Sequence, residues 1–225
     1  ERRGVLDGEA ELVDVAGPGV AAERIDRGAR DTQRGIAASE PHLLGKVLGI
    51  GEEAVRHEKN LPSPWSDYFV SEIEYGREIG LKDKVLQATK VIYSFEAQRN
   101  LKRLIDKTRA DVAHAHNIYH HISPAIFSTL KDAGVPVVMT AHDLKLACPS
   151  YKMLRDGRIC EDCKGGRIHN VVVNRCVKDS LQLSAVVFAE TLLHRSLGLY
   201  RNKVDRIVVP SRFYREKLIE WGWPA

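Results

Sequence analysis

Side chains that can exchange protons near neutral pH follow two short apolar runs. The first run is DVAHAH, at 111–116, and the second is PVVMT, at 136–140. The candidate site residues at and just beyond these two ends are His114, His116, Asn117, His142, Asp143 and Lys145. Imidazole titrates close to neutral pH and both donates and accepts hydrogen bonds. A lone histidine is more often structural, but several histidines at two run ends that face one crevice favour acid–base or binding chemistry.

A histidine metal site is an alternative interpretation of the same residues. However, HAHNIYHH at 114–121 lacks the pair of histidines four apart with an adjacent glutamate that a helical zinc protease motif needs.

Four cysteines suggest a second kind of chemistry, with the spacing C-x11-C-x2-C-x12-C: Cys148, Cys160, Cys163 and Cys176. The central pair is followed by Gly165 and Gly166 and is shaped like a zinc knuckle, in which two thiolates of one tight turn meet two ligands from elsewhere. The pattern predicts a structural zinc, with His142 or His169 as substitutes for one cysteine. Reduced surface thiols, two disulfides in an oxidising compartment and a redox CxxC are the alternatives.

The cysteines lie in a basic stretch. Residues 145–178 carry eight basic side chains against three acidic ones, whereas the whole chain has a formal charge of only +4. A local basic surface suits phosphate-bearing substrates or the anionic face of a membrane, and a solvated charged loop is the simpler alternative. Nucleic acid is not expected as a partner, because aromatic residues are not interleaved with the basic ones.

The composition is that of a globular protein outside the membrane. With 225 residues, 44% of them hydrophobic, the chain can build a substantial core. Its beginning lacks a signal pattern, and the longest apolar stretch, Leu183–Leu193, is interrupted by Glu190. We therefore expect a cytoplasmic protein, with peripheral contact at the inner face of the membrane as an option.

The elements that must position the candidate residues alternate between helix and strand. Apolar residues three or four apart over 83–107 predict one long amphipathic helix. The two apolar runs enclose a helical pattern with Pro124 in its first turn and Gly134 as its stop, which makes a βαβ unit. A helix over 181–199, a strand over 204–209 and a helix capped by Ser211 follow.

The fold class predicted from this alternation is α/β, with a Rossmann-like parallel sheet and helices on both faces. Ligands of such sheets gather beyond the carboxyl ends of the strands, where the histidines stand.

The first 55 residues differ from the rest. No aromatic residue precedes Trp65, and nine of the 17 glycines fall within the first 51 residues. Such a segment buries little area. We interpret 1–55 as an atypical segment, disordered or non-native, and place the Rossmann-like domain at 56–225, with the Cys-containing insertion at about 145–178.

Several ordered pieces of 56–225 together resemble the acceptor domain of family-4 glycosyltransferases, in the subgroup with a cysteine-bearing insertion. The pieces are ADVAHAHNIYHHISPAI, GVPVVMTAHDLKLACPSYKMLRDGRICEDCKGG, RCVKDSL and VDRIVVPSRFYREKLIEWGWP. The resemblance implies one half of a GT-B architecture and transfer, with retention, from a nucleotide-sugar donor, a UDP- or GDP-sugar, to a saccharide or lipid-linked acceptor. Surface polysaccharide or glycolipid biosynthesis is the implied setting.

The resemblance also assigns site residues. It places His116 next to the transferring sugar as the catalytic position, and Asn117, His142 and Asp143 in the substrate pocket. We expect Lys145 in the same pocket because it follows the second apolar run. Only Gly17 and Gly19 resemble the family's glycine loop, and the resemblance is weak. The family's donor-binding domain with paired glutamates is absent from this sequence, so we expect a fragment inactive alone. The alternative is a non-catalytic, metal-stapled Rossmann-like binding or scaffolding module.

Overall fold

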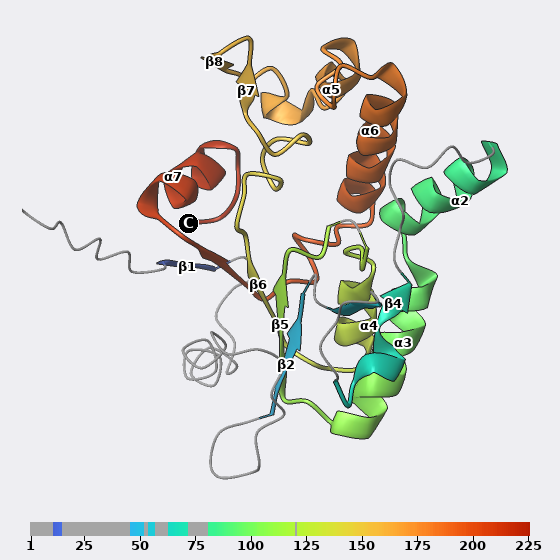
Figure 1. The fold of residues 1–225 in the computed structure, drawn as a ribbon. Coiled ribbons are helices and arrows are strands. Elements are labelled where there is room, and N and C mark those ends of the chain that lie inside the picture. The colour runs from blue at the N-terminus through green and yellow to red at the C-terminus, as the bar shows by residue number, and fades with distance from the viewer. Residues whose placement is uncertain (1–10, 15–45, 52–53, 57–62, 72–80, 120) are drawn as a thin grey trace, which may run out of the picture.

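The molecule is built around a five-stranded sheet in the order β1-β9-β6-β5-β2. The computed structural model describes residues 11–14, 46–51, 54–56, 63–71, 81–119 and 121–225. The strands are β1 Glu11–Asp14, β2 Val47–Ile50, β5 Val112–His116, β6 Val137–Thr140 and β9 Arg206–Val209. The last four run parallel, and β1 lies antiparallel beside β9 at one edge (Figure 1). The predicted α/β class with a Rossmann-like parallel sheet is confirmed.

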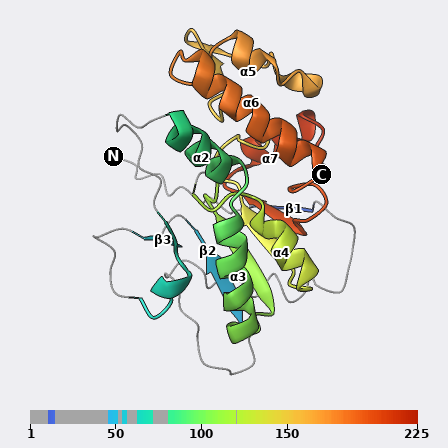
Figure 2. The ribbon, with the colours of Figure 1, turned by 90° about the vertical axis from the view of Figure 1, so that its right-hand side faces the viewer.

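Helices α3 and α4 cover one face of this sheet (Figure 2). The helices are α2 Leu81–Ile92, α3 Phe95–Thr108, α4 Ile126–Asp132, α5 Asn170–Val173, α6 Leu181–Ser196 and α7 Arg212–Glu220. Because strand side chains alternate, Ala113 and Ala115 of β5 join Leu101 of α3 and Phe127 of α4 in the main core. The opposite face carries a smaller apolar cluster of Val47, Val112, Val138 and Val208.

Short elements complete the described chain. Strands β3 Val55–Arg56 and β4 Val70–Ser71 pair in parallel, and β7 Leu154–Arg155 and β8 Arg158–Ile159 form an antiparallel hairpin. Two 3-10 turns are η2 Ser66–Tyr68 and η3 Lys164–Gly166. The hairpin, α5 and α6 all belong to the connection from β6 to β9, and they stand beyond the carboxyl ends of the parallel strands (Figure 1).

The single helix predicted over 83–107 is wrong, because the chain breaks into α2 and α3 at Tyr93 and Ser94. Ser94 is extended (φ −88°, ψ 99°), and its hydroxyl accepts a hydrogen bond from the Ala97 amide at 3.2 Å. This is an N-cap, which starts a new helix while leaving the amphipathic spacing nearly in phase. The pattern of apolar residues alone therefore does not show the break.

The sheet extends into the segment before residue 56. Strand β2 pairs with β5 from Val47 opposite Val112 to Ile50 opposite Ala115, and Leu48 and Ile50 lie in the main core. Asp111 holds the start of this strand, since its carboxylate accepts from the Lys46 amide at 2.7 Å. Gly17 and Gly19, which weakly resemble the family's glycine loop, lie outside the described residues.

Candidate functional site

The structure brings His116 and His142 together. Strands β5 and β6 are parallel neighbours, with His116 opposite Thr140. Their carboxyl ends therefore lie side by side at the same end of the sheet. His116 is the last residue of β5, and His142 follows β6 by two residues. Their Nδ1 and Nε2 atoms are 3.0 Å apart, which is a hydrogen bond between two imidazoles. This juxtaposition is the one expected from the βαβ pattern.

His114 lies behind this pair on the same face of β5. Its ring centroid is 4.1 Å from that of His116, and its Nε2 is 2.8 Å from the Thr140 hydroxyl. Burial lowers the pKa of His114 to about 4, and the neighbouring His116 and His142 add to the effect. His114 is therefore neutral near pH 7. The three rings form a row, here called the histidine row (His114, His116 and His142), whose innermost member carries no charge.

Asn117 turns the chain away at the end of β5. Its φ of 45° lies in the left-handed region, which asparagine tolerates better than most residues. The side chain is half-buried, and the next two residues, Ile118 and Tyr119, turn inward and are buried. Asn117 thus stands just beyond the carboxyl end of β5, and its predicted contact with substrate stays a prediction.

Asp143 and Lys145 take part in the turn that follows β6. The Asp143 carboxylate accepts from the Lys145 amide at 2.8 Å, and the Leu144 carbonyl accepts from the Cys148 amide, also at 2.8 Å. The Lys145 ammonium points inward and donates to the Glu190 carboxylate at 2.9 Å and to the Pro149 carbonyl at 3.1 Å. Its predicted contact with substrate stays a prediction.

Glu190 is the residue of this region that sequence reasoning missed. It is 1% exposed in α6, and its second carboxylate oxygen lies 4.0 Å from His194 Nδ1. His194 in turn bonds to the Ile92 carbonyl at 2.7 Å, which ties α6 to α2. The signal that could have found it is its place as the only charged residue within the apolar run 183–193.

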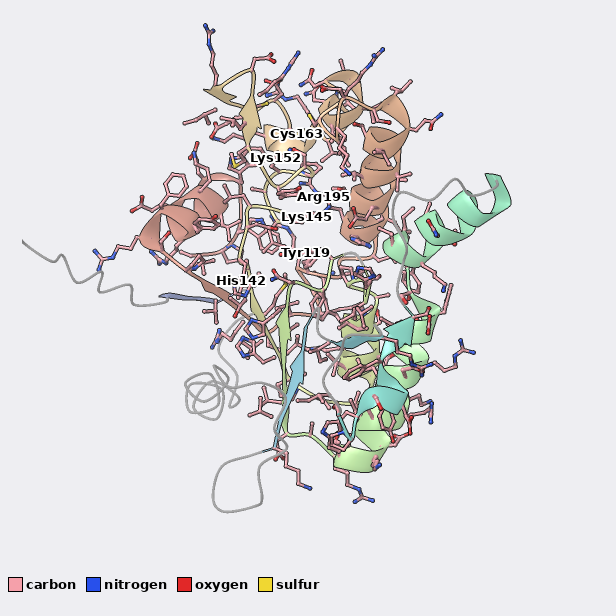
Figure 3. All side chains as sticks on the ribbon, viewed as in Figure 1. Tyr119, His142, Lys145, Lys152, Cys163 and Arg195 are labelled. Atoms are coloured by element: carbon pink, nitrogen blue, oxygen red, sulfur yellow. The ribbon has the colours of Figure 1, made fainter. Side chains whose placement is uncertain are left out.

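Two tyrosines line the same interior. Burial, reinforced by the charges of Asp143 and Glu190, raises the pKa of Tyr119 well above its ordinary value. Tyr200 is shifted in the same direction by burial and by Tyr119. Both hydroxyls are buried and hydrogen-bond to no other described atom. Figure 3 shows His142, Tyr119, Lys145 and Cys163 in sequence from the end of the sheet up to the insertion.

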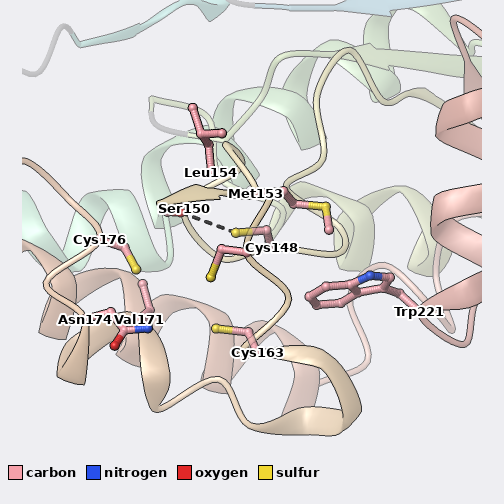
Figure 4. Close-up of a pocket in the computed structure, with 10 residues that line it drawn as sticks. Cys148, Ser150, Met153, Leu154, Cys163, Val171, Asn174, Cys176 and Trp221 are labelled. Carbon is pink, nitrogen blue, oxygen red and sulfur yellow. Dashed lines mark hydrogen bonds between the residues drawn. The ribbon is translucent and has the colours of Figure 1, made fainter. Parts of the chain in front are cut away.

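All four cysteines line one pocket in the insertion (Figure 4). They are free thiols, Cys148 and Cys163 being buried and the other two half-buried. Burial and the three neighbouring cysteines raise the pKa of Cys163 to about 12.

The basic stretch is partly neutralised within the chain. Lys145 pairs with Glu190, Lys164 pairs with Glu161 and Glu220, and Arg155 pairs with Asp156 and Asp162. The positive potential that residues 145–178 offer to an external anion is therefore smaller than their composition implies.

The family model for Glycosyltransferase Family 4 matches residues 71–225, which include the histidine row and the cysteine pocket. No curated protein and no solved structure matches the chain. Among the described helices, none combines the length and the apolar character needed to cross a bilayer.

Proposed function

Because the chain belongs to glycosyltransferase family 4, we propose that it supplies the acceptor-side half of a GT-B enzyme that transfers a sugar with retention. The donor in this proposal is a UDP- or GDP-sugar, and the acceptor is a saccharide or a lipid-linked glycan of a surface polysaccharide or glycolipid pathway. In the reaction an acceptor hydroxyl oxygen bonds to the anomeric carbon. The bond from that carbon to the nucleoside diphosphate oxygen breaks, and the departing diphosphate takes up the proton of the hydroxyl.

The observation that carries the proposal is the hydrogen bond between His116 and His142 at the carboxyl edge of β5 and β6. Ligands of open parallel sheets bind at this edge. Two imidazoles from adjacent strands fix one another's orientation there through this hydrogen bond. They suit an uncharged, hydroxyl-rich group such as a sugar better than an ion.

The bond between the two rings also sets a tautomer. A neutral imidazole has one nitrogen that donates and one that accepts. If His142 Nε2 donates to His116 Nδ1, the proton of His116 resides on its Nε2; the opposite choice leaves that atom an acceptor. His142 thereby decides whether His116 presents a donor or an acceptor to a sugar hydroxyl. In this proposal His116 is the catalytic residue and His142 positions it.

The other predicted substrate residues shape the surface at the carboxyl ends of β5 and β6. Asn117 places an amide beside His116, and Asp143 fixes the turn that carries His142 through its bond to the Lys145 amide. Lys145 supports this turn from within through Glu190.

We place the enzyme in the cytoplasm, in peripheral contact with the inner face of the membrane. Support comes from the β7–β8 hairpin, where Leu154 and Ile159 lie opposite one another and are 59% and 77% exposed. Arg158 stands beside Ile159 in β8, and Arg155, which pairs with Asp156 and Asp162, stands beside Leu154 in β7. Apolar side chains flanked by arginines are the composition that an anionic lipid surface binds.

The test is a kinetic comparison in the gene product that contains this chain. We expect His116→Ala to lower kcat about 100-fold or more, as expected for loss of a positioned group, with the melting temperature nearly unchanged. His116→Gln, which keeps hydrogen-bonding atoms, should lose less. Release of UDP or GDP from matched sugar donors gives the rate, and NMR of the product gives the anomeric configuration.

Two outcomes would count against this proposal. An unchanged kcat/KM in His116→Ala would remove His116 from the reacting centre. A loss of rate that parallels a large fall in melting temperature would assign the histidine row to stability.

A further inference from the structure

The insertion brings together thiols from three separate stretches of chain. Cys148 ends the turn after β6, Cys160 and Cys163 follow the β7–β8 hairpin, and Cys176 follows α5. All four line the same pocket, together with Ser150, whose hydroxyl is 3.3 Å from the Cys148 sulfur (Figure 4). The loop path that brings the outer cysteines to the central pair is not apparent from the sequence.

The backbone fixes the positions from which these sulfurs project. The amides of Cys148, Cys160 and Cys176 donate to the carbonyls of Leu144, Met153 and Val171 at 2.8, 2.9 and 3.1 Å. After Cys163 the chain reverses through Gly165 and Gly166, with φ of 69° and 88°. Glycine takes such angles most readily, so the run CEDCKGG at 160–166 forms the tight turn that a knuckle requires.

The insertion has little apolar core of its own. Its large apolar side chains include Leu154, Ile159 and Val173, which are 59%, 77% and 71% exposed. The side chains that are buried include Met153, Ile168 and Val171. A loop of this length with so few buried side chains needs another source of order, which small domains obtain from disulfides or from a metal.

We propose that Cys148, Cys160, Cys163 and Cys176 bind one zinc ion as a structural site. Each thiol loses its proton to solvent as its sulfur becomes a ligand, and the four thiolates surround the ion tetrahedrally at about 2.3 Å. Among the described residues, no three histidine, cysteine or acidic side chains stand at the spacing of a preformed metal site. Binding therefore draws the sulfurs inward by rotation about their side-chain bonds.

Charges of both signs lie around the pocket. Four thiolates and Zn²⁺ carry a net double negative charge, which nearby cations offset. Arg155 interacts electrostatically with Cys176 and Arg195 with Cys163, whereas the Asp162 carboxylate acts on both thiols in the opposite sense. A closed set of four sulfur ligands leaves no open position for substrate, so the role is structural.

Zinc content of the protein purified without added metal tests the proposal. We expect about one zinc per chain in the unaltered protein, and a loss of most of it in each of the four single Cys→Ser variants. Ser150→Ala is the matched control, because it alters the same pocket without removing a thiol, and it should keep its zinc. Zinc near zero in the unaltered protein, or retained in all four Cys→Ser variants, would overturn the site.

A second measurement avoids variants that fail to fold. The unaltered protein is treated with a chelator, and its thiols are titrated in the native state. We expect thiols to become reactive only after chelation, together with new protease cleavage within 145–178 and an intact sheet. Four reactive thiols before chelation would contradict the proposal, as would two disulfides seen by mass. Neither readout depends on glycosyl transfer.

Discussion

At the scale of single residues, the histidine row combines a buried neutral ring with a pair at the sheet edge. His114 is 5% exposed and His142 is exposed, although both rings belong to one row. A proton is much more costly on the inner ring, because burial removes the hydration of the charged form.

This arrangement predicts that acid weakens the fold through His114. Its folded pKa of about 4 lies below its ordinary value of 6.5. Between these values the unfolded chain takes up a proton at this residue and the folded chain does not. The contribution of His114 is therefore complete above pH 6.5 and is lost as the pH falls towards 4, by on the order of 3 kcal/mol.

Urea unfolding across this pH range measures the effect. The unaltered protein should lose stability more steeply than His114→Gln, whose amide does not titrate. His194, whose pKa is also lowered by burial, accounts for part of the slope that remains in the variant. Equal slopes in the two proteins would show that His114 is accessible to protons in the folded state.

At the scale of elements, the ion pair of Lys145 and Glu190 joins the turn after β6 to α6. Its side chains are 5% and 1% exposed, so removal of one partner leaves a buried charge without its counterpart. We expect Glu190→Ala to lower the free energy of unfolding by about 3–5 kcal/mol. The double replacement Lys145→Met with Glu190→Leu should recover much of this loss, since no charge then remains buried.

The control for this prediction is an ion pair at the surface. Glu220→Ala removes a partner of Lys164 at an exposed site and should barely change the urea midpoint. If the Glu190 variant behaved like the Glu220 variant, water would have to reach the Lys145 ammonium.

The elements were predictable to different degrees. Strands β5 and β6 were recognisable because uninterrupted apolar runs with β-branched residues mark buried parallel strands. Strand β2 was not, since its four residues include Gly49 and alternate between half-buried and buried. The break before α3 depends on one serine hydroxyl, which leaves no trace in the periodicity.

In the site, contacts between neighbouring strands were predictable from the sequence, whereas contacts between distant parts of the chain were not. His116 and His142 meet because their strands are adjacent, and adjacency follows from the βαβ unit. The inward course of Lys145 depends on Glu190, 45 residues further along the chain, and local sequence carries no information on that pairing.

At the scale of the whole molecule, the sheet gathers strands from distant parts of the chain, so residues before 56 contribute to stability. Leu48 of β2 is 7% exposed in the main core. We expect Leu48→Ala to cost about 2–5 kcal/mol in urea unfolding. Leu192→Ala, the same change at a position that is 48% exposed, should stay within about 0.5 kcal/mol. Equal small effects would place β2 outside the cooperative unit.

The long connection between β6 and β9 also affects how the chain is made. Strand β9 covers the edge of β6, yet residues 141–205 separate the two strands. At about 5–20 residues per second, a ribosome needs several seconds to make this connection. During that interval β6 is a bare edge with unpaired backbone groups, which can pair with other chains and start aggregation. Slower translation of residues 141–205 therefore lengthens the time for which the edge of β6 is exposed.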